Sequence, residues 1–418
     1  GFGGPQGMFV IESAIAKAAE KLGIDAAEIQ RANLLKEGDE FHYGQRTTGC
    51  EALNCWDTAH KSFEVEKLKQ AVSTYNSSHD FSKKGFAVMP ICFGISFTKT
   101  LMNQARALVH VYTDGSVGMS TGAVEMGQGV NTKMLQVAAH VFSIGAGRIK
   151  IESTNTTRVA NTSPSAASAT ADLNGKATEI ACKAIRARLL KRAAIELKVA
   201  ENQVDLINEM VFCNGIATDL NWPKLVMACF LNRESLSESA HYATPEIHFD
   251  ASKEKGHPFA YHVYGTALFS VTLDCLRGTY EFDYVKIVHD YGISMNPSID
   301  KGQIEGGLVQ GIGWMTLEEL IYNADGKLLT NALSTYKVPD IYSVPKEIEI
   351  HPLQTGGSDK AIFNSKAVGE PPLMYGIGAY FAIRNAVRAF NPKADIALSA
   401  PFTPEKVLLN LYQGVKLV

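Results

Sequence analysis

The sequence contains no long hydrophobic run and no concentrated block of basic residues. Because no stretch of about 18 or more apolar residues occurs, nothing in it predicts a membrane span. The formal net charge is -3, and without a basic cluster no surface is expected to neutralise nucleic-acid phosphates. The first residues also lack the basic and apolar regions of a signal peptide. These absences predict a cytoplasmic protein that binds neither a membrane nor nucleic acid.

Metal-ligating patterns are missing as well. The 7 cysteines are scattered and never form Cys-x-x-Cys, so they offer no zinc or iron–sulfur cradle. The histidines show neither His-x-His nor His-x-x-x-His spacing. There is no Walker A loop, and no Gly-x-Gly-x-x-Gly fingerprint follows a strand pattern. We therefore expect no metal ion held directly by side chains, and cysteines that act as small buried apolar residues.

The patterns that are present mix helices with strands. Apolar residues at helical spacing over residues 8–22 end at Gly23, and Asp25 with Glu28 forms a capping box that opens a helix reaching residue 35. Asp-Gly between two alternating segments, residues 107–112 and 116–121, predicts a hairpin with a two-residue turn. Further helices are expected at 65–75, 132–142, 173–197, 296–314, 373–390 and from 404, and further strands at 149–153, 267–273 and 280–290. The fold class is thus α+β, in two or more elongated domains.

Four loops rich in glycine, serine and other small residues each lead into a helical pattern. They are residues 1–6, 125–129, 163–168 and 366–372. A helix N-terminus presents unpaired N–H groups and a positive dipole end, which suits an anionic ligand, and glycine lets the backbone approach it closely. Taken singly, each loop is better explained as a plain turn. Four in one chain leave a ligand site and a set of plain turns equally open.

Glu370 stands between Gly369 and the Pro371-Pro372 step, which restricts the backbone around its carboxylate. Such rigidity suits a general base, which must be held within hydrogen-bond reach of the proton it removes. From the residues alone, a solvated glutamate or one that stabilises the start of the following helix is the stronger explanation. Lys366, four residues earlier, could tune its charge.

Two phenylalanines lie in glycine-containing segments, Phe2 in Gly-Phe-Gly-Gly and Phe97 in Phe-Gly-Ile-Ser-Phe-Thr. For any phenylalanine, packing in the core is the commoner role. The alternative is a pair of walls around a flat heteroaromatic ligand. The residues by themselves thus indicate three features: an anion-binding region, a rigid glutamate and two candidate aromatic walls.

Five segments resemble the xanthine dehydrogenase/aldehyde oxidase family, and its xanthine dehydrogenase branch most closely. They read GFGGPQ, FGISFT, VEMGQG, SPSAAS and KAVGEPPL, at residues 1–6, 93–98, 124–129, 163–168 and 366–373. Their order and wide spacing agree with the family too. The resemblance implies the C-terminal half of the molybdenum-binding region, built from elongated molybdopterin-binding domains with mixed sheets and packed helices. Residues 1–75 would end the first such domain and form a connector, and residues 76–418 would form the second.

By that resemblance, Glu370 is the base that deprotonates a molybdenum-bound hydroxyl, which attacks an electron-poor carbon of the substrate. Phe2 and Phe97 would enclose the substrate, Thr98 would hydrogen-bond it, and Lys366 would lie near Glu370. Molybdenum would be held by the pterin dithiolene, with only the backbone of Ala167 beside it. The cofactor is molybdopterin, with or without a cytosine dinucleotide extension, and its expected contacts are Gly3, Gly127, Gln128, Gly129, Ala166, Ala167 and Ser168.

The function implied by the resemblance is oxidation of a purine, xanthine or hypoxanthine, with water-derived oxygen. Electrons would pass to 2Fe-2S and FAD chains or domains. The family's substrate-orienting Glu and Arg lie upstream of Gly1, so the N-terminal half of the molybdenum region is an expected partner, in a homodimer of complete units. Because the chain starts at Gly1 in mid-loop, we expect a fragment, a processed chain or one subunit of a split enzyme. The alternatives are an aldehyde oxidase, another N-heterocycle hydroxylase of the nicotinate type, and a non-catalytic assembly chain; the retained Glu370 and Gln128 favour an enzyme over the last.

Overall fold

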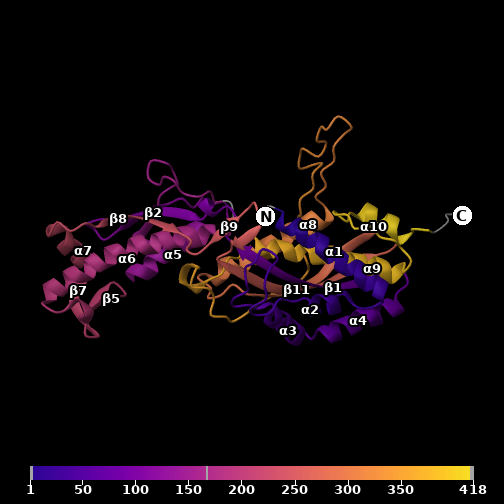
Figure 1. Ribbon diagram of the computed structural model, residues 1–418, viewed down its shortest axis with the longest axis horizontal. Helices are drawn as coiled ribbons and strands as arrows, with labels where there is room; N and C mark the ends of the chain where they lie inside the picture. Colours follow the sequence, from indigo (N-terminus) through magenta and orange to yellow (C-terminus); the bar gives the residue numbers. More distant parts are fainter. Residues whose placement is uncertain (1–2, 166–167, 415–418) are drawn as a thin grey trace.

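The computed structural model describes residues 3–165 and 168–414 and shows an elongated molecule with two lobes (Figure 1). We call them the β1 lobe and the β2 lobe, after a strand in the main sheet of each. The chain forms helices and the first strand of the β1 lobe, crosses to build the β2 lobe, and returns to the first sheet at β11. Each main sheet has its own set of helices. The segments that connect the two lobes lie between them (Figure 1).

The β1 lobe is organised on a four-stranded mixed sheet in the order β1-β11-β12-β13. The first two strands are long and pair antiparallel without a register shift, from Ser82 opposite Asp274 to Ile95 opposite Tyr261. The third strand is also antiparallel and the last is parallel to it. The strands are β1 (Ser82–Ile95), β11 (Tyr261–Asp274), β12 (Thr279–His289) and β13 (Ile348–Pro352).

Helices cover both faces of this sheet, and alternate strand residues serve the two faces. Met89 and Phe269 belong to the apolar cluster under α8, α9 and α10, against which Phe9 of α1 also packs. Val88 and Leu268 belong to the cluster under α2, α3 and α4 on the opposite face. These helices are α1 (Gly4–Leu22), α2 (Ala26–Ala32), α3 (Ala52–Ser62), α4 (Val65–Ser78), α8 (Pro297–Thr316), α9 (Ile377–Phe390) and α10 (Pro404–Leu411).

The β2 lobe contains a second four-stranded sheet, in the order β4-β3-β2-β8, and a smaller antiparallel sheet of β5, β6 and β7. The long helix α6 crosses the larger sheet beside α5, and Trp222 of α7 closes the core. The strands are β2 (Gln104–Val111), β3 (Val117–Thr121), β4 (Ile149–Ile151), β5 (Val204–Ile207), β6 (Met210–Cys213), β7 (Ile216–Asn221) and β8 (Ser237–Ala243). The helices are α5 (Val130–Phe142), α6 (Thr170–Leu197) and α7 (Trp222–Leu231). A short hairpin, β9 (His248–Asp250) with β10 (Lys255–His257), precedes the return to the β1 lobe.

The α+β class with mixed sheets and packed helices is confirmed, and so are several local signals. Gly23 ends α1 in the left-handed conformation at φ 69°, and the capping box of Asp25 opens α2. The predicted hairpin is present, but the predicted two-residue turn is wrong. Tyr112 donates its N–H to Ser116 at 2.8 Å, which leaves a three-residue loop in which only Gly115, at φ 82°, has positive φ.

Other elements had no clear signal. α3 lies in a stretch that the sequence suggests is a connector, and the sheet of β5, β6 and β7 was not predicted. Both α3 and this small sheet are stabilised by burial against distant segments of the chain. The periodicity of neighbouring residues does not predict such contacts. Among the described residues, no helix is long and apolar enough to cross a membrane.

Candidate functional site

Two of the four small-residue loops meet through a pair of hydrogen bonds between Ser168 and Glu370. The N–H of Ser168 donates to Oε2 of Glu370 at 3.0 Å, and the N–H of Glu370 donates to Oγ of Ser168 at 2.6 Å. The two residues are 202 positions apart in the chain. This reciprocal pairing fixes the backbone and carboxylate of Glu370 against the loop that precedes α6.

The position of Glu370 also depends on close backbone packing behind it. Glu370 caps the 3-10 helix η5 (Pro371–Gly376), whose first residues are the two prolines. A Cβ on Gly311 of α8 would stand 2.1 Å from the carbonyl oxygen of Leu373. Only glycine permits that approach, so the backbones of α8 and η5 lie in direct contact. This contact fixes η5 and therefore the position of Glu370, which directly precedes it.

A buried chain of hydrogen bonds joins α6, β11 and the segment before Glu370. The hydroxyl of Tyr261 donates to Oδ2 of Asp172 at 2.6 Å and accepts from the N–H of Ala367 at 3.0 Å. Asp172 also accepts from the N–H of Ile362 at 3.2 Å. Burial raises the pKa of Asp172 to about 6, although the hydrogen bond from Tyr261 opposes the rise. Neither residue stood out in the sequence, since each lies inside a regular element.

Lys366 is buried, and its side chain forms an ion pair with the fully buried Asp290. Its ammonium also lies 5.7 Å from the ring centre of Tyr264. Asp290 in turn accepts a hydrogen bond from Thr355 at 2.8 Å. Lys366 thus reaches the lining of the same cavity as Glu370, but its charge is matched by Asp290.

Two cavities meet at Glu370, which lines both of them. The smaller, of about 400 Å³, is formed by the loops and is called here the loop cavity. The larger, of about 800 Å³, is the aromatic cavity. The loop cavity is bordered by Gln128, Lys133, Ser165, Ser168, Asp172, Gln303 and Lys366. The aromatic cavity is bordered by Phe41, Tyr43, Phe93, Phe97, Thr98, Lys99, Phe259 and Met374.

The loop that precedes α5 is closed by Glu125. Its carboxylate accepts from the N–H groups of Gly127 at 2.9 Å, Gly129 at 3.0 Å and Asn131 at 3.0 Å. Burial acts to raise the pKa of Glu125, but these backbone hydrogen bonds outweigh it and lower the pKa. The donors at this helix N-terminus are therefore already satisfied inside the chain. Gln128 borders the loop cavity, while its amide hydrogen-bonds the backbone of Met126 and Val124.

Phe97 and Thr98 follow the end of β1, where the buried Asn103 holds the loop. Oδ1 of Asn103 accepts from the N–H of Phe97 at 2.7 Å, and its amide donates to the carbonyl of Phe97 at 2.8 Å. Asn103 is a positioning residue that sequence reasoning missed. Gly3 is the N-cap residue of α1, with φ 99°. It lies next to the aromatic cavity, since the following residue, Gly4, lines that cavity. The remaining expected contacts, Phe2, Ala166 and Ala167, lie outside the described residues.

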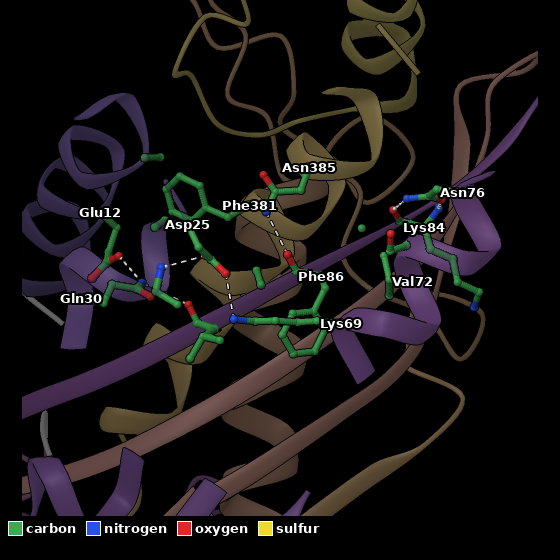
Figure 2. A pocket seen from close by; sticks show the side chains of 17 residues that line it. Glu12, Asp25, Gln30, Lys69, Val72, Asn76, Lys84, Phe86, Phe381 and Asn385 are labelled. Atoms are coloured by element: carbon green, nitrogen blue, oxygen red, sulfur yellow. Dashed lines mark hydrogen bonds and ion pairs between the residues drawn. The ribbon is translucent and has the colours of Figure 1, made fainter. Parts of the chain in front are cut away.

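Figure 2 shows a third cavity, of about 480 Å³. It shares a polar wall with the aromatic cavity, because Glu12 and Gln30 line both cavities. In that wall, Nε2 of Gln30 donates to Oε2 of Glu12 at 2.7 Å. Burial raises the pKa of Glu12 to about 7. Figure 2 also shows the ion pair of Asp25 with Lys69 at the rim. Since Glu370 and the predicted substrate residues do not border this space, we place the site in the first two cavities.

The loop cavity offers polar groups to a cofactor. Its lining combines the hydroxyl and amide groups of Ser165, Ser168 and Gln303 with the carboxyl groups of Asp172 and Glu370. The ammonium groups of Lys133 and Lys366 in this lining are paired with Asp300 and Asp290. The volume is in the range of small-molecule and cofactor sites. Within the described part of the chain, no group of three or more His, Cys, Asp or Glu could hold a metal ion. The polar groups of this lining fit a pterin cofactor.

Comparison with known proteins agrees with this class of site. Two family models, each described as a molybdopterin cofactor-binding domain, match residues 58–345 and 1–34. The chain therefore belongs to the molybdopterin cofactor-binding domain family. Its resemblance to xanthine dehydrogenase is confirmed by 41% identity to the xanthine dehydrogenase/oxidase of Mus musculus, over 97% of this chain and 29% of that protein. The xanthine dehydrogenase of Oryza sativa subsp. japonica is 40% identical over 97% of this chain and 29% of its own length.

Solved structures show the same fold. Quinoline 2-oxidoreductase from Pseudomonas putida 86 superposes with a TM-score of 0.85 at 22% identity, over 97% of this chain and 52% of that one. The aldehyde oxidoreductase from Desulfovibrio desulfuricans superposes with a TM-score of 0.79 at 23% identity, over 98% of this chain and 41% of that one. The chain thus spans about 30% of its curated relatives and about half of the quinoline enzyme's chain.

Proposed function

We propose that this chain is the part of a molybdenum hydroxylase that carries the general base, and that the substrate is a purine such as xanthine or hypoxanthine. The observation that carries the proposal is the position of Glu370 at the junction of the two cavities. The loop cavity would take the pterin, and the aromatic cavity would take the heterocycle. Sequence similarity to xanthine dehydrogenases over 97% of the chain supports the purine.

Glu370 would act as the base by accepting a proton at its carboxylate from the water-derived oxygen that attacks the substrate carbon. One of its oxygens accepts from the N–H of Ser168, which aims the carboxylate and leaves lone pairs for the proton. The packing of η5 on α8 keeps this group from moving as the proton is transferred. The molybdenum cofactor, when bound, supplies the oxidation of the substrate carbon and takes up its electrons.

Gln128 and Ser168, which border the loop cavity, would contact the pterin and its phosphate, together with Ala166 and Ala167. Gly3, Gly127 and Gly129 are further proposed contacts; the N–H groups of Gly127 and Gly129 donate to Glu125 in this structure, so these two residues would act by shaping the loop that presents Gln128. Lys133 adds a cation to the same lining, and its ammonium forms a buried ion pair with Asp300 at 2.7 Å. Phe97 and Thr98 would contact the purine, with Phe2 as the second aromatic wall. Lys366 is paired with Asp290. Its proposed role is therefore to stabilise the segment that carries Glu370, and direct contact with the substrate is a lesser role.

The proposal requires partners that complete the enzyme. We propose the N-terminal half of the molybdenum region, with iron–sulfur and FAD chains or domains, in a homodimer of complete units. Residues 1–75 would finish the first molybdenum domain and residues 76–418 form the second. An exposed segment supports the presence of partners. Residues 317–347 extend away from the β1 lobe as an excursion with several exposed apolar side chains (Figure 1). Its most exposed large apolar side chains are Leu333 at 79%, Ile341 at 77% and Tyr342 at 91%.

The test is Glu370→Gln in the complete, molybdenum-loaded enzyme, assayed with xanthine and hypoxanthine. Glutamine keeps an acceptor for Ser168 but cannot take the proton, so kcat should fall by roughly 10²–10⁴-fold at unchanged molybdenum content. The control is Glu405→Gln, an exposed glutamate in the first turn of α10, which should keep full activity. Retention of most activity by Glu370→Gln, with metal content confirmed, would show that another group is the base.

A further inference from the structure

The aromatic cavity holds one strongly basic side chain, Lys99, among the described residues that line it. Lys99 directly follows Phe97 and Thr98, and its side chain is exposed. Its ammonium forms no ion pair within residues 3–165 and 168–414. Most exposed lysines face bulk solvent, whereas this one borders the cavity that the proposed function assigns to the substrate.

Neither the two glutamates nor His262 in this lining forms an ion pair with Lys99. Glu12 lies in the wall with Gln30 and is buried, so burial disfavours its charged form. His262 is buried among Phe41 and Tyr43, where burial lowers its pKa to about 4 and keeps the ring neutral. Glu370 stands at the junction with the loop cavity and is the proposed base.

The cavity therefore has an asymmetric charge distribution. A carboxylate marks the place of the reaction, and an unpaired ammonium stands in the segment that follows Phe97. An aromatic ring bound between them would have its reacting carbon near Glu370. A negative group elsewhere on that ring could then approach Lys99, and the two opposite charges would attract each other at this solvent-exposed edge of the cavity.

We propose that Lys99 is a specificity-determining residue that selects an anionic heterocycle: a planar nitrogen heteroaromatic with a negative charge on an edge other than the one oxidised. This inference deepens the proposed function and rests on it. An acidic purine bound as its anion, or a ring that carries a carboxylate, has the required chemistry. A neutral ring of the same shape would fit the aromatic walls without using the ammonium.

The test compares purine-6-carboxylate with purine-6-carboxamide, which are nearly equal in size and differ in charge. Both are measured with the complete enzyme by equilibrium binding and, separately, by turnover. Wild type should bind the carboxylate more tightly. In Lys99→Met the ratio of the two affinities should fall about three- to tenfold, while Lys99→Arg, which keeps the charge, should restore it. Added salt should reduce the wild-type preference and leave the ratio in Lys99→Met unchanged.

The matched control is Lys393→Met, which removes an exposed lysine that borders neither the aromatic nor the loop cavity. This variant should keep the wild-type ratio. The inference is overturned when wild type shows no preference for the carboxylate, or when Lys99→Met weakens both ligands equally. A molybdenum-loaded wild type that oxidises none of these purines, nor xanthine or hypoxanthine, would instead contradict the proposed function. The binding ratio still decides the role of Lys99 in that case.

Discussion

At the scale of single residues, three carboxyl groups near the site have different environments. Glu125 accepts three backbone N–H groups, which lower its pKa against the effect of burial, and it acts as the fixed anion of its loop. Asp172 is buried with the hydroxyl of Tyr261, and burial raises its pKa to about 6. Glu370 accepts one N–H, from Ser168, and borders both cavities. Of the three, only Glu370 borders both cavities.

The raised pKa of Asp172 predicts a pH-dependent stability. A carboxyl whose pKa is higher in the folded state stabilises the fold below its unfolded pKa of about 4, and this contribution is lost as the pH rises through about 6. Asp172→Asn keeps an oxygen for Tyr261 but does not titrate. From pH 4 to pH 7, the free energy of unfolding of wild type should therefore fall, relative to the variant, by roughly 2–3 kcal/mol.

Urea unfolding of both proteins at several pH values between 4 and 7 checks this expectation. The exposed Asp80 provides the control, since Asp80→Asn should give a curve parallel to that of wild type. Parallel curves for wild type and Asp172→Asn would mean that the buried carboxyl does not take up the proton.

At the scale of elements, the base is placed by contact between α8 and η5. Gly311 and Gly376 let the two backbones approach so closely that a Cβ on Gly376 would stand 2.1 Å from the carbonyl carbon of Gly311. The pattern of residues 296–314 predicts the helix but not which of its glycines meets η5. That choice depends on how the helix rotates against the segment, which tertiary packing decides.

Gly311→Ala should therefore displace η5 and with it Glu370. The added methyl would stand 2.1 Å from the carbonyl of Leu373, so the backbone must shift, and overpacking of this kind costs typically about 1–3 kcal/mol. We expect a lower melting temperature and a fall in kcat larger than any change in KM.

Gly306→Ala is the matched control on the same helix, because a Cβ there meets nothing within 4 Å. It should be neutral or stabilise the protein by up to about 1 kcal/mol through helix propensity. Equal behaviour of the two variants in thermal unfolding and turnover would exclude this account of how Glu370 is positioned.

At the scale of the whole molecule, the site lies where the two lobes and their crossing loops meet. Ala169 and Leu173 of the β2 lobe share an apolar cluster with Tyr261, Val263 and Ala367 of the β1 lobe. This cluster brings the loop before α6 against the Glu370 segment. The excursion at residues 317–347 extends away from the β1 lobe and exposes Leu333, Ile341 and Tyr342 (Figure 1).

We propose that the exposed side chains of Leu333, Ile341 and Tyr342 contact the N-terminal half of the molybdenum region. Replacing all three with serine should therefore weaken the association of that half with this chain. Because these side chains are 77–91% exposed, their replacement should leave the melting temperature of the isolated chain nearly unchanged. Co-purification of the two halves and thermal unfolding of the single chain measure the two effects.

Leu231→Ser serves as the control, since this residue is 71% exposed at the end of α7 in the other lobe. It should not alter association. Full association of the triple variant would show that the excursion has another role.

The sequence by itself determined the family, the α+β class and the signals that act over a few residues. Gly23, the capping box of Asp25 and the restricted backbone of Glu370 follow from local sterics and hydrogen bonds, which neighbouring residues specify. The tertiary structure decided which distant groups meet. Ser168 pairs with Glu370 and Asp172 with Tyr261 where the two lobes pack together, and Lys366 pairs with Asp290 within the β1 lobe. Such contacts depend on the packing of whole elements, and no spacing along the chain reports it.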